Sequence, residues 1–227
     1  MPERARIAGW EPCSSCDWPG RLAAVLFLAG CPWRCAYCHN AHLQSASQPP
    51  GGWLALAERL AARTAFLDGV VVSGGEPLAD PALPELLQAL REMGFATGLH
   101  TGGAYPDRLQ RALPWLDWVG LDIKTAFDDY HTVTGVPRSG EPVRRSLDIL
   151  LTSGIEFECR TTLHPAWHDE TALAALAAEL AALGVKHYHW QTARLPKPWP
   201  AAPADWPGSL LLQQAERLFE AFSLRAA

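Results

Sequence analysis

The chain alternates short apolar runs with longer segments in which apolar residues recur with helical spacing. The short runs predict strands at 21–29, 69–73, 95–100, 115–124, 155–162 and 185–191. The longer segments predict helices at 53–66, 81–93, 104–113, 141–151, 168–183 and 209–222, with Asp169 as an N-cap. Strands that alternate with helices are typical of an α/β protein with a parallel sheet and helical crossovers.

No linker or shift in composition divides the chain, so we expect one domain over residues 1–227 with its core at about 20–195. A proline-rich stretch at 195–208 predicts a loop before the last helix. Hydrophobic residues make up 48% of the chain and charged residues 19%, which allows a sizeable core.

Charge and hydropathy narrow the function classes. The formal charge is −5 and the isoelectric point about 5.9, which argues against a nucleic-acid-binding surface. The start shows no secretory signal and no apolar stretch approaches membrane-spanning length, so we expect a cytoplasmic protein with no membrane contact. In a reducing compartment, clustered cysteines indicate metal binding or chemistry rather than disulfides.

Three cysteines follow the first predicted strand with the spacing C-x3-C-x2-C: Cys31, Cys35 and Cys38. Thiolates this close can face one small volume, and they favour zinc, copper(I) or iron–sulfur clusters. Three ligands on a [4Fe–4S] cluster leave one iron open, as catalysis requires. The alternatives are a structural zinc site completed by Cys13 or Cys16, or reduced thiols with a structural role only.

Glycines and polar residues gather where the second and third predicted strands end. The second strand runs into Gly74, Gly75 and Glu76. Paired glycines permit a ligand to approach the backbone, and the carboxylate could bind an ammonium group. The third strand ends at Thr101, again followed by two glycines.

Charged residues occur at the ends of the next two predicted strands. Strand alternation places Asp122 and Lys124 on one face of the fourth strand. Arg160 and Glu158 share a face of the fifth strand, and we expect an ion pair between them. Active sites of α/β barrel enzymes lie at the carboxyl ends of the strands, where all these residues fall.

Several of these motifs together resemble the radical S-adenosylmethionine (SAM) superfamily. The resemblance rests on GCPWRCAYCHN at 30–40, VVSGGEPL at 71–78 and the Asp122-Ile123-Lys124 segment. Asp17-Trp18-Pro19-Gly20 and Arg160-Thr161-Thr162 extend the likeness to the activating enzymes of glycyl-radical proteins, especially those of anaerobic ribonucleoside-triphosphate reductases. The resemblance implies a partial (βα)6 TIM-type barrel.

The resemblance also implies a site and a reaction. The cysteine triad would ligate a [4Fe–4S] cluster, whose open iron would bind SAM, and reductive cleavage would give a 5′-deoxyadenosyl radical. Tyr37 would lie near the adenine, and the glycines with Glu76 near the methionine amino group. The full set of implied cofactor-binding residues is Tyr37, Gly74, Gly75, Glu76, Thr101, Asp122, Lys124 and Arg160.

The implied partners are a glycyl-radical protein, namely anaerobic ribonucleoside-triphosphate reductase, and a flavodoxin- or ferredoxin-type electron donor. Two other functions stay open at this point. One is a radical SAM enzyme with a small-molecule substrate, of the 7-carboxy-7-deazaguanine synthase type. The other is a non-enzymatic zinc protein.

The sequence departs from the family pattern at two places. Gly102 stands where the family commonly has Asn after the threonine, so a side-chain contact there is expected to be lost or moved. The C-x2-C pair of Cys13 and Cys16 has no counterpart in the pattern, and we assign it no role. Cys159 is expected to be a packing residue.

Overall fold

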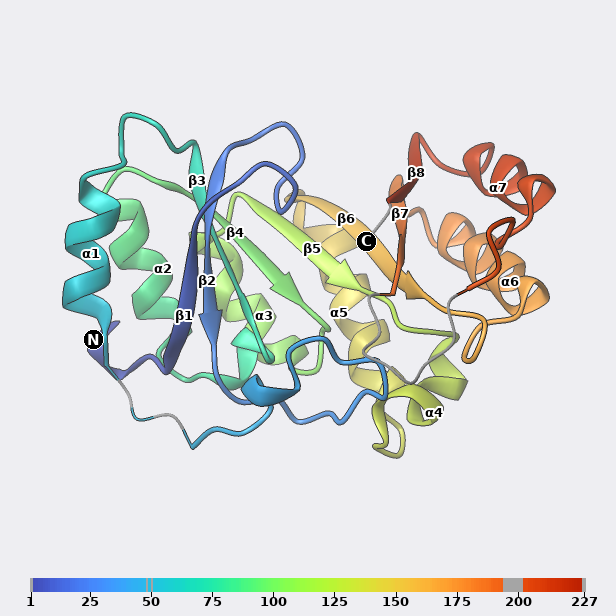
Figure 1. Cartoon of the computed structure of the whole chain (residues 1–227), viewed down its shortest axis with the longest axis horizontal. Helices are drawn as coiled ribbons and strands as arrows, with labels where there is room; N and C mark the ends of the chain where they lie inside the picture. Colours follow the sequence, from blue (N-terminus) through green and yellow to red (C-terminus); the bar gives the residue numbers. More distant parts are fainter. Residues whose placement is uncertain (1, 48, 50, 194–201, 226–227) are drawn as a thin grey trace.

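The computed structural model describes residues 2–47, 49, 51–193 and 202–225, and its centre is one sheet of eight strands (Figure 1). The strand order follows the chain, from β1 to β8. β1 is antiparallel to β2, and every later pair is parallel. The strands are β1 (Ile7–Ser14), β2 (Ala23–Leu28), β3 (Gly69–Gly74), β4 (Ala96–Thr101), β5 (Trp118–Asp122), β6 (Glu156–Leu163), β7 (His187–Thr192) and β8 (Ala221–Arg225).

Helices connect the parallel strands and cover the outer face of the sheet, as Figure 1 shows. Their leucine-rich faces pack on outward side chains such as Leu26 and Leu99 and form one large core. Asp169 caps the sixth helix as predicted, accepting a hydrogen bond from the Ala172 amide at 2.7 Å. The helices are α1 (Trp53–Ala61), α2 (Leu83–Glu92), α3 (Pro106–Ala112), α4 (Tyr130–Thr134), α5 (Gly140–Ser153), α6 (Glu170–Ala182) and α7 (Ser209–Glu216).

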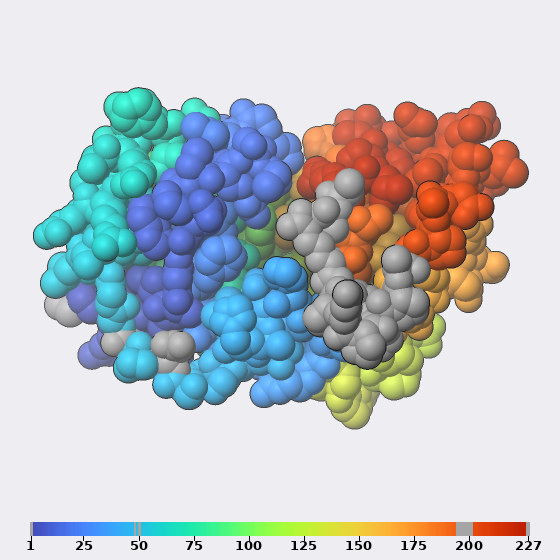
Figure 2. Space-filling view, in the orientation of Figure 1, coloured from blue at the N-terminus to red at the C-terminus, as the bar shows by residue number. Residues whose placement is uncertain are grey.

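The curved sheet forms an open barrel, because β1 and β8 lie at its two edges. Figure 2 shows the start and the end of the chain, in blue and red, on opposite sides of this face of the molecule. The amino end of the barrel is closed by Trp18, which stacks on Trp118 with ring centroids 5.6 Å apart. Gly69 and Gly98 make room for that indole, so the interior stays free only toward the carboxyl ends of the strands.

The fold confirms the predicted α/β class and partial barrel, but the strands at the two edges of the sheet were not predicted. The hydrophobic pattern predicts no strand before residue 21, whereas Ile7–Ser14 forms β1. The alternation of apolar and polar residues along β1 is weak, because β1 is an edge strand in which no residue is fully buried.

The second difference is at the end of the chain, where the predicted helix 209–222 is too long. α7 ends at Glu216, and Ala221–Arg225 forms β8 parallel to β7. Aromatic contacts between Phe222 and Trp190 hold this strand. Most of the proline-rich stretch lies outside the described residues, and 202–208 is neither helix nor strand. No helix in the described part of the chain is long and apolar enough to cross a membrane.

Candidate active site at the carboxyl ends of the strands

The cysteine loop follows β2 and is held by backbone hydrogen bonds. The Gly30 amide donates to the Leu43 carbonyl at 2.7 Å, and the Arg34 amide donates to the Thr134 carbonyl at the end of α4 at 2.9 Å. Cys31, Cys35 and Cys38 therefore line a single cavity, each partly buried. The predicted triad is thus brought together at the expected end of the sheet.

Burial shapes the chemistry of these thiols. It raises the pKa of Cys31 to about 11 and also raises the pKa of Cys35. Without metal, the thiols of Cys31 and Cys35 are therefore protonated at neutral pH, and metal binding must release their protons. The Lys124 ammonium acts in the opposite direction on both groups and would stabilise thiolate ligands.

The three thiols fit a cluster better than a single metal ion. Among the described residues, no three His, Cys, Asp or Glu side chains converge closely enough to hold one ion. Thiolates that bind different irons of a cubane do not need to converge on one point. Cys13 and Cys16 are exposed on β1 and the turn after it and do not line this cavity, which disfavours a zinc site completed by them. Cys159 is fully buried in the core, as expected of a packing residue.

Gly74 and Gly75 allow the backbone at the end of β3 to lie very close to the backbone at the end of the neighbouring strand β2. Gly74 has φ of +131°, and a Cβ at either glycine would collide with the backbone of Leu28 or Gly30. The Gly75 amide donates to the Leu28 carbonyl at 2.9 Å. Both glycines also line the cavity, so they combine tight packing with exposed backbone.

The Glu76 carboxylate joins the ends of β3 and β4. It accepts hydrogen bonds from the Thr101 hydroxyl at 2.6 Å, the Gly102 amide at 2.9 Å and the Leu78 amide at 3.1 Å. Burial raises the pKa of Glu76, although these three hydrogen bonds act to lower it. Glu76 and Thr101 therefore form one rigid unit in the cavity wall.

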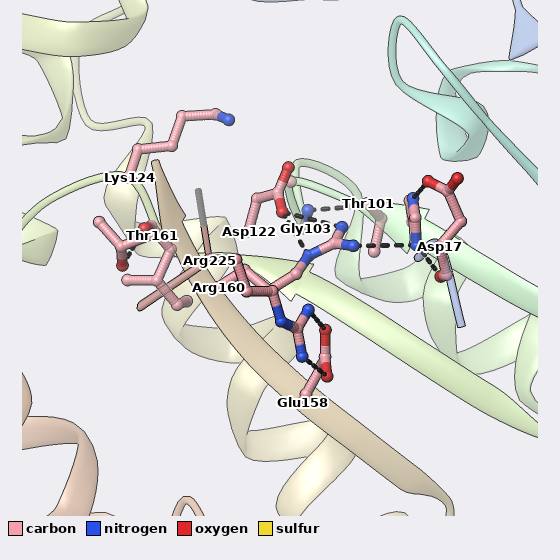
Figure 3. Close-up of polar contacts among 12 residues, drawn as sticks. Asp17, Thr101, Gly103, Asp122, Lys124, Glu158, Arg160, Thr161 and Arg225 are labelled. Atoms are coloured by element: carbon pink, nitrogen blue, oxygen red, sulfur yellow. Dashed lines mark hydrogen bonds and ion pairs between the residues drawn. The ribbon is translucent and has the colours of Figure 1, made fainter. Parts of the chain in front are cut away.

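Asp122 is held by Arg160, its register partner on the neighbouring strand (Figure 3). The guanidinium Nε donates to Asp122 Oδ1 at 3.0 Å, and its Nη1 lies 2.9 Å from His100 Nε2. Burial opposes ionisation of Asp122, but the charges of Arg160 and Lys124 hold its pKa below the usual value. Arg160 lies behind the cavity wall, whereas Asp122 and His100 line it.

The expected ion pair between Glu158 and Arg160 is wrong. Glu158 binds Arg225 of β8 through two hydrogen bonds of 2.8 and 2.9 Å (Figure 3). Residues two apart on a strand share a face but lie along the strand axis, whereas Arg225 and Asp122 approach from other strands. The sequence could not reveal this partner, because the predicted last helix ended at residue 222 and no strand was predicted at Arg225.

Lys124 lies just beyond β5 and lines the cavity beside the cysteine loop. Its ammonium is 5.6 Å from the Trp33 ring centroid and 5.9 Å from that of Tyr37. Burial opposes the charged form, yet nearby Tyr37, Cys35 and Asp122 raise the pKa of Lys124 well above its usual value. No carboxylate pairs with this ammonium in the part of the chain that the structure describes.

Tyr37 and His100 are two further side chains that line the cavity. Tyr37 is buried against Trp167, with ring centroids 5.4 Å apart, and its hydroxyl finds no hydrogen-bond partner among the described residues. That unsatisfied group suits a polar ligand atom. His100 Nε2 lies 2.7 Å from the Asp17 carbonyl, and burial together with Arg160 lowers the pKa of His100 to about 4.

Trp33 and His100 also line the cavity, although neither was predicted as a site residue. His100 pairs in register with Gly120, and Gly120 and Asp122 lie on the same face of β5. Strand alternation could therefore have predicted that His100 lines the cavity together with Asp122. No local pattern predicts the position of Trp33, because its partners Lys124 and Gly102 are far from it in the sequence.

Comparison with known proteins gives a consistent result. The model of the radical SAM superfamily matches residues 25–178. A Methanocaldococcus jannaschii protein with the provisional name glycyl-radical enzyme activating enzyme is 30% identical over 181 residues, which cover 77% of this chain and 75% of that protein. The pyruvate formate-lyase-activating enzyme of Clostridium pasteurianum is 34% identical over 145 residues, 60% of this chain and 59% of the enzyme, so the match spans under two thirds of that relative.

A solved structure supports the fold. Streptococcus suis SuiB bound to S-adenosylmethionine superimposes with a TM-score of 0.63 at 13% identity, covering 86% of this chain and 48% of SuiB. At that identity the likeness concerns the fold alone.

Proposed function

The chain belongs to the radical SAM superfamily and is related to glycyl-radical enzyme activating enzymes, and from this premise we propose that it generates the glycyl radical of anaerobic ribonucleoside-triphosphate reductase. The observation that carries the proposal is the cavity itself. It combines three thiols, a buried carboxylate and an unpaired ammonium at the carboxyl ends of the strands.

Each part of the cavity has a task in this proposal. Cys31, Cys35 and Cys38 hold a [4Fe–4S] cluster, which, when bound and reduced, supplies the electron that splits SAM into methionine and a 5′-deoxyadenosyl radical. Gly74, Gly75 and Glu76 present backbone and carboxylate oxygen atoms to the amino group of SAM. These three residues form the glycine–glycine–glutamate motif at the end of β3.

The other wall of the cavity binds the rest of SAM. Lys124 offers its ammonium to the carboxylate of SAM, and Arg160 fixes Asp122 next to it. Tyr37 places its ring and its unsatisfied hydroxyl beside the adenine. Trp18 and Trp118 close the far end of the barrel and exclude water from below the reaction site.

A protein substrate is favoured over a small molecule by the relatives and by the open sheet. The related protein of M. jannaschii and the pyruvate formate-lyase-activating enzymes carry names that describe the activation of another enzyme, in the first case a glycyl-radical enzyme. The barrel is open between its edge strands, which gives a protruding glycine loop a path to the cavity. The electron would come from a flavodoxin- or ferredoxin-type donor.

Electron spin resonance tests the proposal. The reconstituted protein is reduced and mixed anaerobically with SAM and the anaerobic reductase from the same organism. We expect a glycyl doublet on the reductase and one 5′-deoxyadenosine per radical. A Gly→Ala variant of the reductase at the radical site is the control.

Two results would contradict the proposal. Formation of 5′-deoxyadenosine with no protein radical would indicate a small-molecule substrate, such as that of the deazaguanine synthase type. A doublet formed on pyruvate formate-lyase but not on the reductase would keep the activity class and change the partner.

A further inference from the structure

We propose that Trp33 is a positioning residue whose indole face holds the Lys124 ammonium in the cavity wall for an anionic group of the ligand. The proposal rests on the proposed function, because it takes the carboxylate of SAM as that anionic group. Trp33 lies between the first two cysteines of the loop, and its side chain is almost fully buried.

The contacts of Trp33 fix its ring on two sides. The ring meets Tyr130 edge-on with centroids 6.0 Å apart, and it lies against the Gly102 backbone at the end of β4. A glycine at this position leaves the space that the indole occupies. The ring is therefore a rigid surface, and its orientation does not depend on the ligand.

Lys124 rests on that surface. Its ammonium lies within about 6 Å of the ring centroids of both Trp33 and Tyr37, a range in which cations are attracted to aromatic faces, with tryptophan the strongest. Asp122, the nearest acidic side chain on the same strand face, already binds Arg160. Arg160 thus keeps the carboxylate occupied, and the aromatic rings hold the lysine.

This arrangement suits a binding site better than a salt bridge would. A carboxylate partner would neutralise the lysine and compete with an incoming anion, whereas an aromatic face restrains the ammonium and leaves its charge available. A restrained cation also loses less conformational entropy when the ligand binds. Trp33 would therefore contribute to affinity without touching the carboxylate of the ligand.

The experiment compares two probes on the anaerobically reconstituted holoenzyme by titration calorimetry. SAM carries the carboxylate, and 5′-methylthioadenosine lacks it. For Trp33→Leu we expect SAM affinity to fall roughly tenfold while methylthioadenosine affinity stays within about twofold. In a Lys124→Met background, the same substitution should have no further effect on SAM.

Two more variants make the test independent of folding. Trp33→Phe keeps an aromatic face and should lose only about two- to threefold in SAM affinity, even if the leucine variant does not retain its cluster. Trp10→Leu is a matched control, because Trp10 on the edge strand β1 makes a cation–π contact with Arg63, whose guanidinium carbon lies 5.2 Å from the ring centroid. It should leave the affinity for both probes unchanged.

Three results would overturn the inference: unchanged SAM affinity in both Trp33 variants, an equal loss for both probes, or an undiminished loss in the Lys124→Met background. The proposed function fails differently. If the native protein binds SAM but forms no glycyl radical on the reductase, the function is wrong, while the role of Trp33 in SAM binding can still stand.

Discussion

Gly102 at the end of β4 packs directly against the indole of Trp33 in the cysteine loop, and the space for a Cβ at residue 102 is filled by that ring. Related proteins were expected to carry an asparagine at this position. The structure shows that the volume of the missing side chain is taken by a residue from another loop. The small residue after β4 and the large one in the cysteine loop therefore complement each other in volume.

Replacing Gly102 with alanine should displace the indole. Because the clash involves a buried ring, we expect Gly102→Ala to lower the free energy of unfolding of the metal-free protein by about 1–3 kcal/mol. Urea denaturation under anaerobic conditions measures it. Gly9→Ala is the control, since that glycine has open space around it, and it should change the value by less than about 0.5 kcal/mol.

A double variant checks the cause of that loss. The clash involves the six-membered part of the indole, so Gly102→Ala should be less costly when Trp33 is replaced by phenylalanine. An equal cost in both backgrounds would mean that residue 102 is constrained by something other than Trp33.

Substitutions of the cysteines should divide into two groups, according to how much iron each variant protein binds. After anaerobic reconstitution, Cys31→Ala, Cys35→Ala and Cys38→Ala should each bind little iron and sulfide, because three thiolates are the minimum set for the cluster. The Cys13→Ser, Cys16→Ser double variant should bind as much as the native protein, since both residues are exposed and outside the cavity. Loss of iron in that double variant would contradict this division.

The parallel sheet and the position of the site could be predicted because they depend on local patterns. Short apolar runs, helical periodicity and the cysteine spacing are each contained within a few residues. β8 could not be predicted in this way. Its segment follows α7 closely, and Phe222 is partly buried because Trp190 and Tyr188 of β7 pack on it.

Within the site, the sequence identified residues better than their partners. Strand alternation placed Asp122 and Lys124 on one face, and both line the cavity. The same rule could not tell that Arg160 binds Asp122 while Glu158 binds Arg225, because side-chain pairing across strands depends on register and reach.

The pair between Glu158 and Arg225 gives a prediction about β8. Glu158 is almost fully buried, and Arg225 with Arg160 keeps its pKa low although burial opposes this. Arg225→Met would leave a buried carboxylate with a weaker set of partners, so we expect the free energy of unfolding to fall by about 2–4 kcal/mol. Adding Glu158→Gln should recover part of the loss. A change below about 0.5 kcal/mol would show that β8 is not held by this pair in solution.

Two buried histidines make the protein less stable in mild acid. Burial, with neighbouring arginine charges, lowers the pKa of His100 and of His189 to about 4, whereas an unfolded histidine titrates near 6.5. Between these values the unfolded chain binds protons that the folded chain does not. Stability is therefore complete above about pH 6.5 and is lost as the pH falls toward 4.

The expected size of the effect can be measured one histidine at a time. Between pH 7 and pH 5, each should contribute about 1–2 kcal/mol to the fall in the free energy of unfolding. His100→Gln can still accept the Arg160 hydrogen bond and should remove its share of the pH dependence. The raised pKa of Glu76 has the opposite effect on the pH dependence of stability. Glu76 is present in both proteins, so its contribution cancels when the variant is compared with the native protein. Equal pH dependence in the native protein and the variant would mean that the pKa of His100 is the same in the folded and the unfolded chain.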